Sequence, residues 1–220
     1  MPLIIFDVDG TLVDSQHEIV AAQGIAFTAH GLPAPSRERA LSVVGLSLTE
    51  AFAALVGADG PIDSLAEAYK AAWLQLRGTP SYSDRLYPGA ADTLAVLAGL
   101  PGVQLGIATG KSRRGLDRII TAQNWGSYFT TIQVADDHPS KPHPSMIRAA
   151  MHEAGASALS TIMIGDTTYD IEMAVAAGVR PIGVAWGYHP ADDLAAAGAT
   201  DIVPTFANLL ALLRQLLELR

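Results

Sequence analysis

The chain of 220 residues has a formal net charge of −8, half of its residues are apolar, and it contains no cysteine. The apolar content excludes a disordered chain, and the acidic balance argues against general binding to nucleic acids or membrane surfaces. Without cysteine, neither disulfides nor thiolate metal sites can form. We expect a cytoplasmic protein, because the apolar run before Asp7 is too short for a signal peptide and no uncharged run could span a bilayer.

The first predicted element is a short strand at residues 3–6, LIIF, whose unbroken apolar sequence indicates burial on both faces of a parallel sheet. The segment DVDGT follows it directly. Because side chains alternate along an extended chain, Asp7 and Asp9 would project on the same side. Two carboxylates so placed repel each other unless a cation, a proton or several donors compensate them. The pattern therefore predicts a charged site at the end of this strand.

Helical periodicity dominates from about residue 16 to residue 76, and no convincing strand interrupts it. Helix-length segments at 18–31, 40–57 and 63–78 each end at a glycine, a residue that commonly terminates helices. This stretch is therefore predicted to be a block of helices that follows the first strand.

From residue 86 onward, predicted helices and strands alternate. The helices are expected at 86–102, 112–124, 143–155, 168–178, 192–198 and 206–220, and the strands at 103–110, 130–135, 160–166, 180–186 and 200–204. Such alternation builds a doubly wound parallel sheet of the Rossmann-like type. We predict an α/β core, residues 1–13 and 87–220, with an inserted all-helical cap, residues 14–86. Since ligands bind beyond the carboxyl ends of the strands in such sheets, the cap would cover the site as a lid.

Polar residues collect where the predicted core strands end. Besides Asp7 and Asp9 they are Thr109 and Gly110 after the second strand, Lys141 after the third, and Asp166 and Asp170 after the fourth. A hydroxyl group, free backbone amides and an ammonium group suit the oxygens of a phosphate. The carboxylate oxygens of Asp7 and Asp166 suit Mg²⁺. A magnesium ion and an anionic substrate would compensate the paired carboxylates.

The order of these segments resembles that of the haloacid dehalogenase-like superfamily. DVDGT, a strand ending in Thr109, Lys141 followed by Pro142, and GDTTYD match its four motifs, and the resemblance spans essentially the whole chain. The helical insertion after DGTLVDS is similar to the family's C1-type cap. The segments LYPGA, SKPHP and MIGDTTYDI make the chain most similar to the phosphoglycolate phosphatase-like branch.

The resemblance implies a Mg²⁺-dependent phosphatase that hydrolyses a small, phosphoglycolate-like phosphate monoester. Asp7 would be the nucleophile that forms an aspartyl-phosphate, and Asp9 would be the general acid and base. The carboxylates of Asp7 and Asp166, together with the backbone carbonyl of Asp9, would hold Mg²⁺. The expected partner is a small phosphorylated metabolite, with no nucleic acid and no membrane, and the protein would be a monomer or a homodimer.

The same resemblance assigns the binding of the phosphoryl oxygens to Thr109, Gly110 and Lys141. Asp170 would orient Lys141 or a metal-bound water. One position departs from the pattern, because many phosphoglycolate phosphatases carry Asn where this chain has Gly110. A backbone amide remains for the phosphate, but a side-chain donor is missing, which leaves the substrate open.

Asp9 separates reactions within the superfamily. Dehalogenases lack an acid/base carboxylate at this position because a halide leaves without a proton, and phosphonatases rely instead on a cap lysine. We interpret the cap residue Lys70 as a solvated helix residue. A β-phosphoglucomutase-like phosphomutase or a pyrophosphatase of the same superfamily remains an alternative. A non-enzymatic phospho-receiver domain is a more remote one, since a receiver is shorter and has no helical block after its first strand.

Other polar and aromatic residues near the predicted site are interpreted as structural. Solvated or ion-paired roles are expected for Lys111, Arg113 and Arg114, loop or structural roles for His138, His143 and His189, and packing roles for Trp186 and Tyr188. Thr109 could also cap the helix that follows it. Gly45 lies between two predicted cap helices, either in a specificity loop of the family or at a simple helix break.

Overall fold

Six parallel strands form one sheet in the order β3-β2-β1-β4-β5-β6 in the computed structural model, which describes residues 1–79 and 84–217. The strands are β1 (Leu3–Phe6), β2 (Gln104–Thr109), β3 (Phe129–Val134), β4 (Thr161–Gly165), β5 (Arg180–Val184) and β6 (Asp201–Val203). Each lies where the sequence predicts a strand, so the doubly wound parallel sheet is confirmed. Residues 80–83 of the predicted insertion and 218–220 of the predicted last helix lie outside the described residues.

The first strand occupies the centre of the sheet. Every residue of β1 is buried, and it pairs in parallel with β2 on one side and with β4 on the other. Ile5, for example, lies opposite Gly106 of β2 and Met163 of β4. An unbroken apolar strand fits this position because both faces of a central parallel strand are covered. The residues that follow β1 consequently emerge at the middle of the sheet edge.

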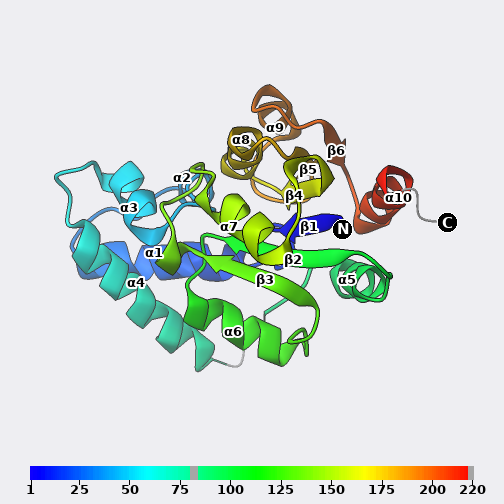
Figure 1. Ribbon diagram of the computed structural model, residues 1–220. Helices are drawn as coiled ribbons and strands as arrows, with labels where there is room; N and C mark the ends of the chain where they lie inside the picture. The colour runs from blue at the N-terminus through cyan, green and yellow to red at the C-terminus, as the bar shows by residue number, and fades with distance from the viewer. Residues whose placement is uncertain (80–83, 218–220) are drawn as a thin grey trace.

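Helices cover both faces of the sheet (Figure 1). On one face, α7 (Ser145–Ala154) and α8 (Thr168–Ala177) pack against Leu3, Ile5 and Met163, and α9 (Ala191–Ala196) lies beside α8. On the other face, α5 (Ala90–Ala98), α6 (Arg113–Ala122) and α10 (Phe206–Leu216) pack against Ile4 and Phe6. Alternate residues of β1 therefore contribute to two separate apolar layers, as the period of a strand requires.

Four helices stand between β1 and α5: α1 (Gln16–Ala29), α2 (Arg37–Leu41), α3 (Leu48–Val56) and α4 (Ile62–Arg77). Figure 1 shows this group, which we call the helical block, beyond the arrowheads of the strands. It has apolar clusters of its own, built around residues such as Phe27, Phe52, Leu65 and Trp73. None of the described helices is long and apolar enough to cross a membrane.

The segments that enter and leave the helical block are paired with each other. Val13 forms an antiparallel bridge with Leu86, and the backbone N–H of Asp14 donates to the carbonyl oxygen of Arg85 at 2.8 Å. The chain thus leaves the sheet and returns to it at one place.

The predicted helical segment 40–57 is divided in the structure. Helix α2 ends at Leu41 and α3 begins at Leu48, with Gly45 between them at φ +98°. A Cβ atom on Gly45 would lie 3.0 Å from the hydroxyl oxygen of Thr167, at the start of α8. The break at Gly45 therefore brings a loop of the helical block against the sheet edge. The structure also shows that Ser112, not Thr109, caps α6.

Candidate active site

Four side chains that follow three of the strands, β1, β3 and β4, meet at one point. Lys141 Nζ lies 2.9 Å from Asp7 Oδ1 and 2.6 Å from Asp170 Oδ1. Asp7, Asp166 and Asp170 each offer an oxygen atom, and these oxygens all lie within 4.8 Å of one another. All four side chains are buried. The structure thus brings together residues that the sequence predicted from separate strands.

A turn at Gly10 allows the loop after β1 to pass this cluster. Gly10 adopts φ +89°, a left-handed conformation that glycine tolerates without steric cost. A Cβ atom there would lie 2.1 Å from Asp166 Oδ2, and one on Gly187 would lie 2.1 Å from Asp166 Cβ. The Asp166 side chain therefore fits only because positions 10 and 187 have no side chain.

Hydrogen bonds fix Asp166 and Asp170. Thr11 Oγ1 donates to Asp166 Oδ1 at 2.8 Å, and the backbone N–H of Tyr188 donates to Oδ2 at 2.9 Å. Asp170 sits in the first turn of α8, where the backbone N–H and the hydroxyl group of Thr167 donate to its Oδ2 at 3.1 and 2.7 Å. This capping box leaves Asp170 Oδ1 for Lys141. Burial raises the pKa of Asp166, and the charges of Asp170 and Asp7 raise it further.

Lys141 is the one cation among the described residues that pairs with Asp7. Oδ1 lies 2.9 Å from the Lys141 ammonium, and among the described side chains no other donor reaches either Asp7 oxygen. Burial raises the pKa of Asp7 to about 7, although the ammonium of Lys141 opposes this shift. Burial alone would lower the pKa of Lys141, but Asp170 and Asp7 raise it instead. A buried carboxylate with a single ammonium partner, which it shares with Asp170, is a natural ligand for a further cation.

The donor set fits Mg²⁺. Asp7 and Asp166 supply hard carboxylate oxygens, which this ion prefers, and they lie in the only acidic cluster with metal-ligand spacing among the described residues. Three buried carboxylates face one ammonium in that cluster, so an added divalent cation would balance their charge. Asp170 is the third acid of the cluster and binds Lys141 through Oδ1, whereas the Asp9 side chain contacts Ser15 and Lys111.

Asp9 is held at the edge of the site by groups that the sequence did not single out for it. Ser15 Oγ donates to Asp9 Oδ1 at 2.6 Å, and Lys111 Nζ lies 2.8 Å from Asp9 Oδ2. The Tyr188 hydroxyl lies 3.1 Å from Ser15 Oγ, so Tyr188 supports this network in addition to packing. The sequence signals were present: Ser15 closes the DGTLVDS segment, and Lys111 directly follows Gly110.

Thr109 and Gly110 complete the edge of the site. Thr109 is buried, and its hydroxyl oxygen accepts the backbone N–H of Lys111 at 3.2 Å. A Cβ atom on Gly110 would lie 2.5 Å from the carbonyl oxygen of Gly45. The loop around Gly45 would have to move if Asn stood at position 110. Gly110 is therefore the residue type that this position of the Gly45 loop allows.

A cavity of about 390 Å³ opens from these residues toward the helical block. Asp7, Asp9, Thr109 and Gly110 line its inner end. The opposite wall comes from α1, α3, α4 and the loop around Gly45. A substrate that fills the cavity would therefore touch both the sheet edge and the helical block.

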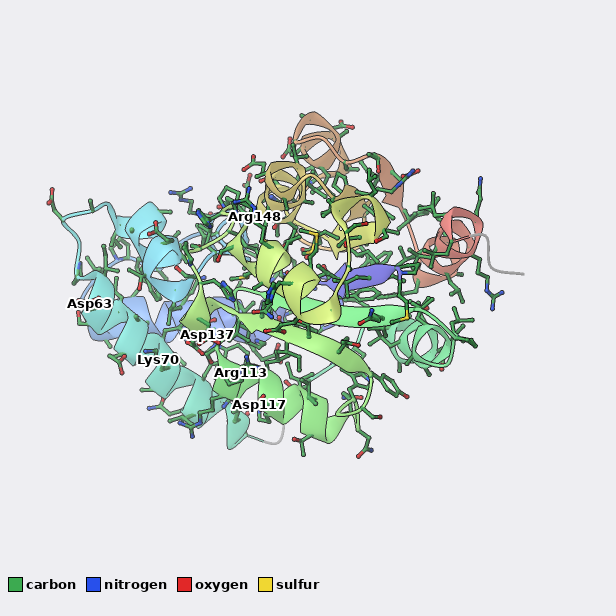
Figure 2. All side chains as sticks on the ribbon, viewed as in Figure 1. Asp63, Lys70, Arg113, Asp117, Asp137 and Arg148 are labelled. Carbon is green, nitrogen blue, oxygen red and sulfur yellow. The ribbon has the colours of Figure 1, made fainter. Side chains whose placement is uncertain are left out.

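Several of the other charged residues and histidines near the site have local partners. Arg113, at the start of α6, pairs with Asp137 at 3.5 Å, and Figure 2 shows the two residues near each other. Lys70 pairs with Glu67 at 2.7 Å, which agrees with a solvated helix residue. Side-chain hydrogen bonds join His138 to Ser145 and Gln133, His143 to the backbone N–H of Ser145, and His189 to that of Thr168. These contacts agree with the predicted structural roles.

Comparisons with known proteins point in one direction. Residues 4–184 match the family described as haloacid dehalogenase-like hydrolase. A protein of Dickeya dadantii named "Probable phosphatase IndB" is 38% identical over 223 aligned residues, covering 99% of this chain and 96% of the relative. A Pseudomonas aeruginosa protein named "Phosphoglycolate phosphatase 1" is 29% identical, covering 94% of this chain and 78% of the relative.

A solved structure agrees with these matches. The crystal structure of a hydrolase from Pseudomonas syringae superimposes with a TM-score of 0.85 at 26% identity, covering 98% of this chain and 99% of that one. The sheet and the helical block are thus both similar to those of a known hydrolase.

Proposed function

The chain belongs to the haloacid dehalogenase-like hydrolase family, and on that basis we propose that it is a Mg²⁺-dependent phosphatase of small organic phosphate monoesters. One observation supports this function best: a buried Asp7 carboxylate, paired with Lys141 and with no other side-chain donor among the described residues, lines a cavity. The names of the similar proteins agree with phosphatase activity and make 2-phosphoglycolate a substrate to test.

The first chemical step transfers the phosphoryl group to the protein. An oxygen of Asp7 attacks phosphorus, the bond between phosphorus and the alcohol oxygen breaks, and an aspartyl-phosphate forms. Asp9 gives a proton to the departing alkoxide. Ser15 and Lys111 hold Asp9 in place for this role, and its side chain stays 13% exposed toward the cavity.

The second step releases phosphate. Water attacks the phosphorus of the aspartyl-phosphate, Asp9 takes a proton from that water, and the bond between phosphorus and the Asp7 oxygen breaks. Lys141 stays beside Asp7 throughout, with Asp170 holding its ammonium from the other side. Thr109 and the backbone amide of Gly110 bind the phosphoryl oxygens. Asp7 is thereby restored as a carboxylate.

Asp7, Asp166 and the backbone carbonyl of Asp9 would hold Mg²⁺. When bound, the ion would offset the negative charge of the carboxylates and of the phosphate, which otherwise repel each other. We also propose that the helical block acts as the lid predicted for residues 14–86, because it lines the cavity opposite Asp7.

The decisive experiment replaces the nucleophile. Asp7→Asn should abolish turnover of p-nitrophenyl phosphate, while Asp117→Asn, on the exposed surface of α6 (Figure 2), should leave it unchanged. The wild-type protein should release many equivalents of inorganic phosphate from a phosphorylated metabolite without forming an isomer of the substrate. Full activity in Asp7→Asn would rule out the aspartyl-phosphate, and isomerised product would indicate a mutase.

A further inference from the structure

The half of the cavity that lies beyond Asp9 has an apolar wall. We propose that the preferred substrate is a phosphate monoester whose alcohol carries an apolar, ring-sized group, in preference to one as small and charged as 2-phosphoglycolate. This inference rests on the proposed phosphatase function. It concerns the alcohol portion of the substrate, which is released when the bond between phosphorus and oxygen breaks.

The apolar wall comes from several helices of the helical block. Tyr69 and Trp73 lie one turn apart on the same face of α4, a spacing that aligns side chains along a helix, and the next residue, Leu74, also lines the cavity. Ile19 of α1 and Phe52 of α3 extend the wall. Trp73 itself is only 8% exposed and meets Tyr69 edge to face, with ring centroids 6.2 Å apart. Ile19, Phe52 and Trp73 are buried, so this part of the apolar wall is preformed, whereas Leu74 is half exposed.

Lys111 joins the apolar wall to the reacting end of the site. Its ammonium pairs with Asp9 at 2.8 Å and lies 5.4 Å from the centroid of the Trp73 ring. An ammonium at this distance from a ring is attracted to it. An alcohol that receives its proton from Asp9 would therefore have its carbon substituent beside Trp73.

The other cations that line the cavity do not form an evident site for a second anion. Lys70 is already paired with Glu67 at 2.7 Å, and the guanidinium of Arg77 lies 5.5 Å from the centroid of the Trp73 ring. Arg114 is exposed. A carboxylate on the substrate would have to displace Glu67 from Lys70 or lie beside Arg77, whose Nε has no hydrogen-bond acceptor among the described residues, whereas an apolar group would contact buried side chains directly.

The size of the cavity agrees with this substrate class. Its volume of about 390 Å³ lies within the range of roughly 300–1,000 Å³ that is usual for pockets of organic ligands. A two-carbon acid would leave much of the apolar wall in contact with water. Each methylene group bound in an apolar pocket favours a substrate by about 10-fold or more. A ring should therefore change kcat/KM strongly.

The test compares three phosphate esters of primary alcohols, so that the bond that breaks is of the same type. These are ethyl phosphate, 2-phenylethyl phosphate and 2-phosphoglycolate, each assayed with Mg²⁺ by release of inorganic phosphate. We expect kcat/KM for 2-phenylethyl phosphate to exceed that for ethyl phosphate by about 100-fold or more. It should also exceed the value for 2-phosphoglycolate.

Two variants locate the effect on the apolar wall. Leu74→Ala should lower the ratio of kcat/KM between 2-phenylethyl and ethyl phosphate by about 10-fold. Leu74 is 52% exposed, so this change leaves the buried clusters intact, whereas Trp73→Ala should lower the ratio further but removes a buried ring. Leu159→Ala is the matched control, because Leu159 is fully exposed and does not line the cavity. It should leave the ratio unchanged.

The outcomes separate the inference from the function on which it rests. Hydrolysis of ethyl phosphate or 2-phosphoglycolate with no gain from the ring would overturn the inference and leave the phosphatase standing. A ratio that is the same in Leu74→Ala, Trp73→Ala and the wild type would also overturn it. If none of the three esters is hydrolysed, both the inference and the proposed function fail.

Discussion

At the scale of single residues, the stability of the site depends on one ammonium group among buried carboxylates. Lys141→Met should destabilise the metal-free protein by about 3–5 kcal/mol, because it leaves Asp7 and Asp170 buried without their cation. Urea denaturation in the presence of EDTA measures this loss. Lys70→Met breaks an ion pair whose lysine is 60% exposed, and should cost no more than about 1 kcal/mol. Equal losses in the two variants would contradict the charge balance described for the site.

Gly10 offers a second residue-scale prediction. Gly10→Ala should both destabilise the protein and abolish most activity, because the new Cβ atom would stand 2.1 Å from the Asp166 carboxylate. Gly31→Ala is the matched control: Gly31 also has a positive φ, +65°, but nothing lies within 4 Å of its Cβ position. The control should lose about 1–2 kcal/mol of stability from the left-handed conformation alone and keep its activity. If the two variants lose equal activity, the clash with Asp166 is not the cause.

At the scale of elements, the loop after α2 lies close against the end of β2, and both line the cavity. Gly110→Ala keeps the backbone amide, yet its Cβ atom would stand 2.5 Å from the carbonyl oxygen of Gly45. We expect kcat/KM for p-nitrophenyl phosphate to fall by at least about 10-fold, and backbone amides of residues 42–47 to exchange faster with solvent. Gly126→Ala, where nothing lies within 4 Å, should change neither measurement.

At the scale of the whole molecule, the buried carboxylates link stability to pH and to metal. Burial raises the pKa of Asp7 to about 7 and raises that of Asp166 as well. The folded metal-free protein therefore binds more protons than the unfolded chain between about pH 4 and pH 7, and these groups make it less stable as the pH rises through that range. Burial lowers the pKa of His189, so this residue alone would make the folded protein more stable as the pH rises.

Thermal unfolding checks this linkage. The increase in Tm on adding Mg²⁺ to EDTA-treated protein should be larger at about pH 8 than at about pH 5.5, because the metal replaces protons that are lost as the pH rises. Asp7→Asn removes one titrating carboxylate and should weaken the pH dependence relative to the wild type. A Mg²⁺ effect on Tm that does not vary with pH would argue against these carboxylates as the metal ligands.

Much of this whole-molecule arrangement could be predicted from the sequence. Apolar strands ending in Asp7, Thr109 and Asp166 had to finish at one edge, since all strands of a parallel sheet point the same way. Strand and helix periods also identified the helical block. These predictions rest on local patterns that do not depend on how the helical block packs against the sheet.

Contacts between the helical block and the sheet edge could not be predicted in this way. The approach of Lys111 to Trp73 and that of Gly45 to Gly110 join residues that are distant in the chain. Their partners depend on the angle at which whole helices pack, which side-chain periodicity does not record. The sequence predicted only a packing role for Tyr188. The hydrogen bond between its hydroxyl group and Ser15 was not predicted, because the two residues are distant in the chain and meet only in the folded protein.

The bridge between Val13 and Leu86 has a consequence for how such a protein can diversify. Because the chain enters and leaves the helical block at adjacent positions, the helical block is a single insertion between two neighbouring residues of the core. A recombination event that exchanges this insertion has to preserve only the short distance between its two ends. Exchange of the helical block alone would keep the aspartates at the sheet edge and change the residues that contact the rest of the substrate.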